Sequence, residues 1–279
     1  MKKILPLFVF TLLSVSLISD IPKVSAQGVG GLVVSPKRIT FEGRGRTQEV
    51  ILANRGNVKK RYRISLVNKK MLEDGKLQDL DESAQPEGDE FFATDVLRYA
   101  PRQITLEAKE TQKIKVLSRL SGNNPDGEYR SHLLFQEIPD ENVAQNADIN
   151  LSEEELSIQI QTIFGVSIPV ILRKGELNFD VQIADPKLRK DQDNHYVDFV
   201  VERSGNKSIL GTAKVFADGE QIGILKGIAV YLSTPRRKVS IKLNSETITD
   251  FVGKDIRIQF GEEEKGDNAP SAEIIFKAT

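Results

Sequence analysis

Cysteine is absent from this chain of 279 residues. Its absence excludes disulfide bonds, thiolate nucleophiles and metal sites built on cysteine. It does not decide the cellular compartment, because many exported proteins have no disulfide.

An excess of one sign of charge is also missing. The sequence has 39 basic and 40 acidic residues, which gives a net charge of −1. A nucleic-acid-binding protein should carry a marked basic excess, so we expect no nucleic-acid partner. Hydrophobic residues make up 39% and charged residues 28%, which is typical of a soluble globular protein.

Few side chains are suited to catalysis or metal binding. The two histidines, His132 and His195, lie far apart in segments that are predicted to be strands, so they do not suggest a metal pair or a catalytic dyad. The sequence has no P-loop, nucleophile elbow or zinc-binding helix motif. We therefore expect no enzymatic activity, no cofactor and no metal.

The N-terminus has the pattern of a secretory signal peptide. Lys2 and Lys3 precede an apolar stretch of about fifteen residues, and the small residues Ser25 and Ala26 suit a cleavage site. A transmembrane helix needs about 20 apolar residues, so this stretch is too short to be an anchor. We predict that residues 1–26 are removed and that the mature protein works outside the cytoplasm.

Short alternating segments separated by glycine and asparagine dominate the rest of the chain and predict an all-β protein. Predicted strands in residues 27–174 cover 32–34, 39–41, 49–52, 61–67, 103–106, 112–117 and 132–136. After a hinge at Gly175, further strands cover 179–183, 196–201, 213–216, 228–231, 238–243, 256–260 and 272–276, with a hairpin turn at Asp218-Gly219. We therefore expect two β-sandwich domains, residues 27–174 and 175–279.

Residues 156–172 are predicted to form one unusually long strand, which follows an acidic loop at residues 139–155. At about 3.3 Å per residue it would reach roughly 55 Å, whereas a domain of this size is only about 35–40 Å across. Its even positions form an apolar row of Leu156, Ile158, Ile160, Thr162 and Phe164. The row could be the buried face of an ordinary strand, or it could be lent to another protein as a missing strand.

Four segments resemble the PapD-like periplasmic pilus chaperones of the chaperone–usher family. They are residues 34–43, 127–139, 168–173 and 248–253, and the likeness extends over essentially the whole mature chain. The resemblance implies two immunoglobulin-like β-sandwiches at an angle, which form a boomerang-like cleft. It also implies that the apolar row binds a fibre subunit by donor-strand complementation.

The resemblance implies roles for individual residues. Arg38 would hold the C-terminal carboxylate of the subunit, and Glu128, Arg173 and Asp250 would form an interdomain set of ion pairs. Pro169 stands where the family usually has a lysine beside the cleft arginine, so Lys37, Lys174 or backbone groups would have to assist Arg38. Proline also predicts a bend in the strand at this point.

Two functions are consistent with these observations. The first is a periplasmic chaperone that binds pilus or surface-fibre subunits and delivers them to an outer-membrane usher, with self-association through the exposed row as a further possibility. The second is a two-domain adhesin or structural cell-surface protein, which uses the long strand only internally. We also considered a periplasmic enzyme, but no motif in the sequence supports one.

Overall fold

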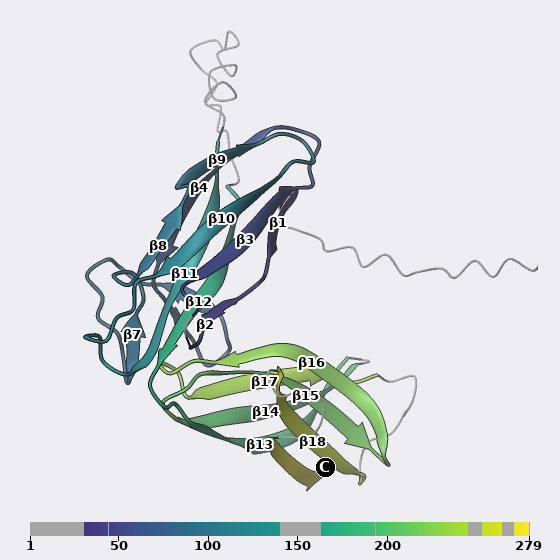
Figure 1. Cartoon of the computed structure of the whole chain (residues 1–279). Coiled ribbons are helices and arrows are strands. Elements are labelled where there is room, and N and C mark those ends of the chain that lie inside the picture. The colour runs from purple at the N-terminus through teal and green to yellow at the C-terminus, as the bar shows by residue number, and fades with distance from the viewer. Residues whose placement is uncertain are drawn as a thin grey trace, which may run out of the picture.

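The computed structural model describes residues 31–43, 45–139, 163–192, 194–244, 253–263 and 271–278. Within these ranges all the extended elements are β-strands, and none of the residues belongs to a helix that could span a bilayer. The strands form two sandwiches set at an angle, with the N-terminal one upright above the C-terminal one in Figure 1. The predicted all-β architecture of two sandwiches is confirmed, while the predicted signal peptide lies outside the described residues.

The N-terminal sandwich has the immunoglobulin-like arrangement of two facing sheets. One sheet has the order β1 (Leu32–Ser35), β3 (Thr47–Asn54), β10 (Thr111–Ser118) and β8 (Leu97–Ala100). The other has the order β2 (Ile39–Phe41), β12 (Gly165–Lys174), β11 (Gly127–Ile138), β4 (Lys60–Val67) and β9 (Gln103–Leu106), with β7 (Glu90–Phe92) parallel to β11. The chain crosses between the sheets from β1 to β2 and again from β8 to β9, and Pro36 and Pro101 lie at these crossings.

Alternation along the strands places one face of each sheet in the core between them. Val50 and Leu52 of β3 and Ile114 of β10 meet Leu133 and Phe135 of β11, and all five are fully buried. The period-two pattern of the sequence therefore predicts this core directly.

The C-terminal sandwich begins after a short link at Gly175, whose φ of 78° is in the left-handed region. One sheet has the order β13 (Phe179–Asp191), β14 (Asn194–Gly205) and β17 (Arg236–Lys242). The other has the order β16 (Glu220–Val230), β15 (Ile209–Ala217), β18 (Asp255–Glu262) and β19 (Ala272–Lys277). Asp218 and Gly219 have φ of 50° and 85°, so the predicted hairpin turn joins β15 to β16.

Several strands are absent from the sequence prediction. They are β5 (Lys69–Met71), β6 (Leu77–Asp79), β7, β8 and the first half of β16. The first four have three or four residues each, too few for alternation to be recognised, and β16 is interrupted by Gly223 and Gly227.

The long predicted strand is described from Ile163 onward. Ile163 and Phe164 precede β12, which begins at Gly165 and continues through Pro169 to Lys174, so the bend predicted at Pro169 does not interrupt the strand. Leu156, Ile158, Ile160 and Thr162 lie outside the described residues.

Among the described residues, no strand pairs with the outer edge of β12 along its first half, and this stretch is called the free edge below. The Phe164 carbonyl accepts a hydrogen bond from the Glu137 N–H at 2.9 Å, so even-numbered residues direct their backbone groups toward β11 and odd-numbered residues direct theirs to the opposite side. Pro169 is odd-numbered, so its missing N–H costs no bond to β11. β2 covers the opposite side only at residues 170–172, which leaves residues 165–169 with β11 as their one neighbouring strand in the described structure.

The core of the N-terminal sandwich gives a direct test of its packing. We expect Leu133→Ala to lower the free energy of unfolding by about 2–5 kcal/mol, because a fully buried side chain leaves a cavity. Urea denaturation measures this loss. Leu117→Ala in β10, where the side chain is 37% exposed, is the matched control and should cost less than about 1 kcal/mol. Equal losses at the two positions would contradict the packing described above.

Candidate functional site

β11 presents a polar face to the C-terminal sandwich. Tyr129, Leu133 and Phe135 point into the core of the N-terminal sandwich, so the alternate residues Glu128 and Arg130, and His132 after them, lie on the opposite face. All three polar side chains are buried, because the second sandwich covers this face. The junction of the two sandwiches is therefore built around charged and polar groups.

Glu128 and Arg173 are direct partners in the register of β11 and β12, and they form an ion pair at the junction. The Arg173 Nε lies 3.0 Å from Glu128 Oε2. Ser208 of the C-terminal sandwich donates its N–H to Glu128 at 3.1 Å and accepts a bond from Arg173 at 3.1 Å. Two members of the predicted ion-pair set thus meet at the junction, while the third, Asp250, lies outside the described residues.

Glu42 adds a second carboxylate that the sequence analysis missed. It follows β2 directly and forms an ion pair with Arg173. Arg173 consequently connects β2, β11 and the C-terminal sandwich, since it also contacts Glu128 and Ser208.

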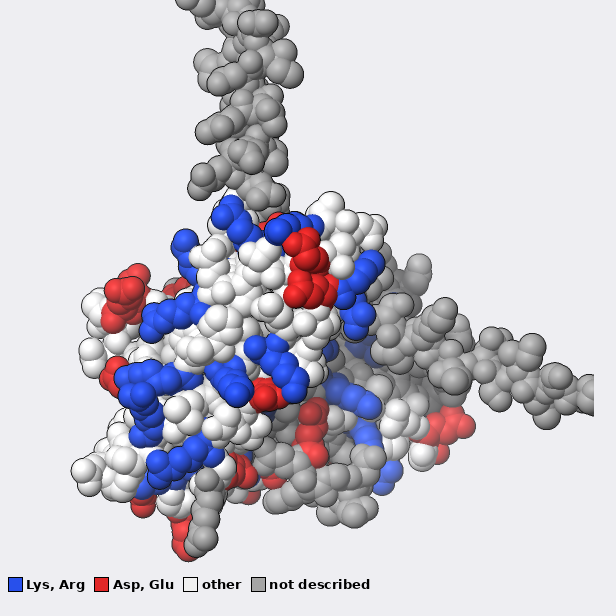
Figure 2. All heavy atoms as spheres, turned by 45° about the horizontal axis from the view of Figure 1, so that its top comes forward, with Lys and Arg blue, Asp and Glu red and all other residues white. Residues whose placement is uncertain are grey.

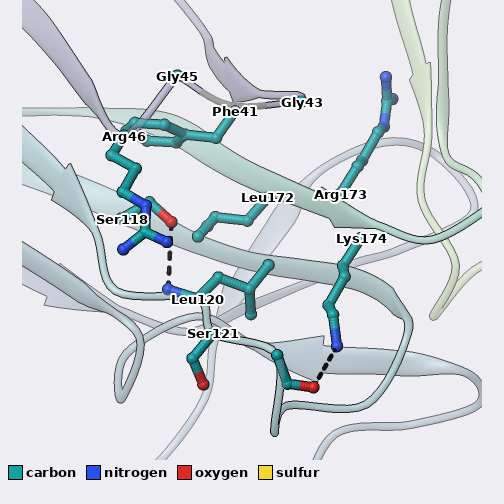
Figure 3. A pocket seen from close by; sticks show the side chains of 11 residues that line it. Phe41, Gly43, Gly45, Arg46, Ser118, Leu120, Ser121, Leu172, Arg173 and Lys174 are labelled. Atoms are coloured by element: carbon teal, nitrogen blue, oxygen red, sulfur yellow. Dashed lines mark hydrogen bonds between the residues drawn. The ribbon is translucent and has the colours of Figure 1, made fainter.

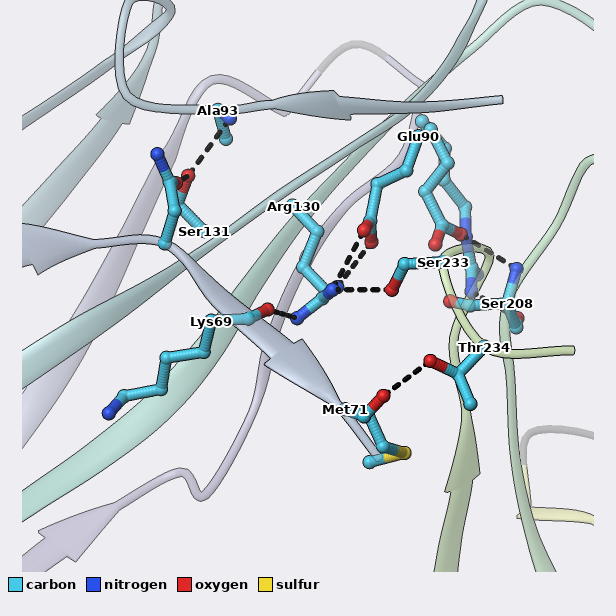
Figure 4. A network of polar contacts seen from close by, with 12 residues as sticks. Lys69, Met71, Glu90, Ala93, Arg130, Ser131, Ser208, Ser233 and Thr234 are labelled. Atoms are coloured by element: carbon cyan, nitrogen blue, oxygen red, sulfur yellow. Dashed lines mark hydrogen bonds and ion pairs between the residues drawn. The ribbon is translucent and has the colours of Figure 1, made fainter. Parts of the chain in front are cut away.

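A second buried ion pair, also missed, joins Arg130 and Glu90 of β7 (Figure 4). Arg130 donates to Glu90 Oε2 at 2.8 Å, to the Lys69 carbonyl at 3.0 Å and to the Ser233 hydroxyl of the C-terminal sandwich at 3.3 Å. Burial raises the pKa of Glu90, and the charge of Arg130 offsets part of this rise.

The hairpin of β5 and β6 reaches across to the same part of the C-terminal sandwich. The Thr234 hydroxyl donates to the Met71 carbonyl (Figure 4). The Lys238 N–H donates to the Glu73 carbonyl at 2.7 Å. Met71 also packs with Ile171 and Tyr231 in a small apolar cluster. Apolar contacts therefore accompany the polar network between the sandwiches.

Arg38 lies beside this junction. The parallel pairing sets Ile39 opposite Val170, and continuing that register by one residue sets Arg38 beside Pro169. Its guanidinium carbon is 5.8 Å from the centre of the Tyr231 ring. One terminal nitrogen of Arg38 is buried and has no hydrogen-bond partner in the described structure.

His132 lies on the other side of Pro169, its register partner in β12. Its ring meets Tyr231 edge-on with 6.4 Å between ring centres. Both ring nitrogens are buried without a hydrogen-bond partner in the described structure. Burial, helped by the positive charges of Arg130, Lys69 and Arg38, lowers the pKa of His132 from 6.5 to about 3, so the imidazole is neutral.

The sequence analysis treated His132 as an ordinary strand residue. A signal was nevertheless present, because Glu128, Arg130 and His132 place ionisable groups at three alternate positions of one strand. Such spacing predicts a strand with one polar face that is covered by something else.

Lys174 faces away from the polar side of β12. Its ammonium, labelled in Figure 3, donates to the Gly122 carbonyl at 2.9 Å. It also donates to the Asn124 carbonyl and forms an ion pair with Asp126. It borders an open cavity of about 430 Å³ lined by Phe41, Gly43, Gly45, Arg46, Ser118, Leu120, Ser121, Gly122, Leu172, Arg173 and Lys174. The ammonium of Lys174, which was expected to assist Arg38, is therefore bound to the loop at residues 122–126. The side chain of Lys37, the other expected assistant, is exposed.

Two large apolar side chains are exposed where the chain enters the free edge of β12. Ile163 is 49% and Phe164 is 39% exposed. Phe164 is the one member of the predicted binding row that the structure describes. Elsewhere, on the face in Figure 2, basic side chains are interspersed with acidic and uncharged ones.

No family model matches the chain, and no curated protein matches it. Among solved structures, it is similar to the YadV chaperone with 14% identity and a TM-score of 0.43, over 82% of this chain and 92% of that one. It is similar to the CsuC–CsuE complex of a chaperone with a tip subunit from Acinetobacter baumannii with 14% identity and a TM-score of 0.44, over 89% and 98%. It is similar to the Salmonella enterica SafA pilin in complex with the SafB chaperone with 12% identity and a TM-score of 0.42, over 88% and 95%. Likeness at this level carries no argument about function.

The ion pair at the junction can be tested by removing its carboxylate. We expect Glu128→Ala to lower the free energy of unfolding by about 3–5 kcal/mol, because Arg173 and the Ser208 N–H lose a buried partner. The matched control is Glu49→Ala, which breaks an exposed pair with Lys113 and should change the stability little. Urea denaturation of both variants measures the difference, and a small loss for Glu128→Ala would contradict the network.

His132 gives a prediction for the pH dependence of stability. The pKa of His132 is lowered in the folded state, so below pH 6.5 the unfolded chain takes up a proton at this residue while the folded protein does not. The stability that the neutral His132 provides is therefore fully present at neutral pH and is lost as the pH falls below 6.5. Between pH 7 and pH 5, we expect the wild type to lose about 2 kcal/mol more stability than His132→Phe. Glu90 is present in both proteins and cancels in the comparison. Urea unfolding at the two pH values provides the measurement, and equal losses would contradict the neutral buried imidazole.

Proposed function

We propose that this protein is a periplasmic chaperone for the subunits of pili or other surface fibres. It lends the apolar row from Leu156 to Phe164 to a subunit as a missing strand. One observation carries the proposal: among the described residues no strand pairs with the outer edge of β12 at residues 165–169, and exposed apolar residues lead directly into that edge.

The free edge accounts for strand pairing. Odd-numbered residues of the first half of β12 direct their backbone groups away from β11, so they can pair with a strand from another protein. A subunit with an incomplete sandwich exposes an unpaired edge of its own, and such edges aggregate unless they are covered. Pairing the two edges would protect both.

The apolar row supplies the free energy. Each large apolar side chain that leaves water contributes about 1.5–3 kcal/mol. Burial of the row and the backbone bonds of the added strand would together have to outweigh the freedom that both proteins lose on binding, and micromolar affinity corresponds to a net gain of about 8 kcal/mol. Capture of a subunit would therefore need neither ATP nor a metal ion.

The junction supports a second point of contact. A buried guanidinium nitrogen of Arg38 without a partner suits a carboxylate, which can accept two hydrogen bonds from one arginine. The C-terminal carboxylate of the bound subunit would supply this group. The hydrogen bonds of Ser208 to Glu128 and Arg173 would help to hold the two sandwiches at the angle that keeps this position beside the free edge.

The signal sequence at residues 1–26 supports export to the periplasm. Delivery of the bound subunit to an outer-membrane usher completes the proposed cycle. In the absence of a subunit, self-association through the apolar row would be the competing reaction, since Ile163 and Phe164 are exposed.

Recovery of clients from periplasmic extract tests the proposal. The tagged wild type should retain fibre subunits, identified by mass spectrometry. Phe164→Asp and Ile160→Asp should lower the yield at least about tenfold, because each places a charge where the bound subunit would bury an apolar side chain. Arg38→Ala should lower it as well.

Ile275→Asp in β19 is the matched control, because Ile275 is 60% exposed and lies in the other sandwich. It should retain clients at the wild-type yield. If the row variants also retain clients at that yield, the proposed mechanism is wrong. A wild type found in the fibre itself, without a client, would favour a structural cell-surface protein instead.

A further inference from the structure

We propose that the β5–β6 hairpin, residues 69–79, is a clasp that fastens the N-terminal sandwich to the start of β17 and sets the angle between the two sandwiches. The proposal rests on the proposed function in one respect, because that angle would determine whether a subunit fits against the free edge. It also assigns a role to three consecutive basic residues of β17, Arg236, Arg237 and Lys238, which the sequence alone does not distinguish from a solvent-exposed strand end.

The hairpin pairs with no other strand of the described structure. β5 and β6 pair with each other from Lys69 opposite Asp79 to Met71 opposite Leu77, and they form a separate two-stranded sheet. An isolated two-stranded hairpin is at best marginally stable in water. The stability of this hairpin must therefore depend on the surface against which it docks.

Two hydrogen bonds attach the hairpin to the C-terminal sandwich. The Met71 carbonyl accepts a bond from the Thr234 hydroxyl, toward which β5 is directed in Figure 4. The Glu73 carbonyl accepts a bond from the Lys238 N–H at 2.7 Å. β17 is an edge strand of its sheet, so the second bond extends the backbone pairing of one sandwich to a segment of the other.

An ion pair joins the same two residues. The Lys238 Nζ lies 2.7 Å from Glu73 Oε2, and both side chains are largely exposed. An exposed pair contributes little to stability by itself. Because Lys238 contacts Glu73 through both its backbone and its side chain, however, the pair fixes where the hairpin sits along β17.

The tip of the hairpin lies against the guanidinium of Arg237. Gly75 has a φ of 82°, and a Cβ atom at this position would lie 1.2 Å from Arg237 Nη1. Glycine suits the tip both for its left-handed backbone and for this close approach. Alternation directs Arg237 to the same side of β17 as the buried Val239 and Ile241, so the tip covers the end of the C-terminal core.

The charge of the hairpin tip complements Arg237. The Nε and Nη1 of Arg237 are buried and have no hydrogen-bond partner in the described structure, so the guanidinium contributes through packing and charge. Burial lowers the pKa of Arg237, and the nearby carboxylate of Asp74 in the tip counteracts this effect. A buried cation without a nearby anion would be costly, so docking of the acidic tip is favoured.

The clasp and Ser208 hold the junction at two separate places. Ser208 bonds Glu128 of β11 and Arg173 of β12, whereas the hairpin leaves the sheet after β4, on the other side of β11. Neighbouring strands are about 4.8 Å apart, so β12 and β4 are separated by roughly 10 Å. Two attachments at this separation resist a rotation that either one alone would permit.

Distances between spin labels test the clasp in the mature chain. Because the chain lacks cysteine, Leu117→Cys in β10 and Ile275→Cys in β19 place one label at an exposed site of each sandwich. Replacement of residues 72–76 by Asn-Gly removes the tip and keeps the register of β5 and β6, since Asn-Gly forms a two-residue hairpin turn. We expect it to widen the distance distribution in pulsed electron paramagnetic resonance at least about twofold, because sandwiches with a smaller interface move relative to each other.

Charge reversal keeps the test decisive if the replacement disturbs folding. Glu73→Lys and Lys238→Glu should each widen the distribution, and the double variant, which restores the pair with its charges exchanged, should return it to the wild-type width. Lys113→Glu is the matched control, because it opposes Glu49 in an exposed pair within the N-terminal sandwich, and it should leave the width unchanged. If the folded replacement leaves the width unchanged, or the double variant is as wide as the single ones, the clasp is wrong.

Recovery of clients shows whether capture depends on the clasp. The hairpin and the free edge lie on opposite sides of β11, so the replacement leaves the proposed subunit-binding row intact. We expect it to lower the client yield at least about threefold, because fewer molecules hold the competent angle. A widened variant that retains clients at the wild-type yield would overturn the role of the clasp in capture.

The clasp and the chaperone function can fail separately. If the width depends on the hairpin but Phe164→Asp still retains clients, the proposed function is wrong and the clasp stands. If clients require Phe164 but the width does not depend on the hairpin, the clasp is wrong and the chaperone function stands.

Discussion

The antiparallel pairing of β11 with β12 is the interaction on which the rest of this molecule depends. One face of the pair closes the core of the N-terminal sandwich through residues such as Leu133 and Leu172. The opposite face carries the charged groups of the junction, and no other strand of the described structure pairs with the outer side of β12 at residues 165–169. A shift of one residue in this register would exchange the two faces and bury charge in the core. Core, junction and binding edge are therefore specified together.

The junction uses buried charge where an ordinary core would use apolar packing. Buried ion pairs add little net stability, because desolvation offsets much of their attraction, but separating one partner from the other is expensive. Glu128 with Arg173 and Glu90 with Arg130 each lie within the N-terminal sandwich, and each pair also bonds a serine of the C-terminal sandwich, Ser208 or Ser233. An arrangement of the sandwiches that moved these serines away would leave buried polar groups without a partner, which is costly. Such a junction favours one interdomain angle more by excluding alternatives than by strong attraction.

Much of this arrangement is visible in the sequence. Alternation predicts the all-β class and most strands, and the likeness of short segments to a known family predicts that Glu128 and Arg173 meet. The rest depends on contacts between distant positions. Arg130 finds Glu90 forty residues away and Tyr231 in the other sandwich, and no local pattern encodes either contact. The sequence could not predict the surroundings of His132 either. That its ring nitrogens have no hydrogen-bond partner among the described residues is known only from the folded structure.

Pro169 also limits how far a guest can extend. Along the outer side of β12, the odd residues from Ile163 to Ser167 offer both backbone groups, Pro169 lacks the donor, and β2 occupies the positions that follow. A guest strand can therefore advance only to this point, where Arg38 and His132 stand on either side. Strands of different length that pair with this edge would therefore all end at the same position, beside Pro169.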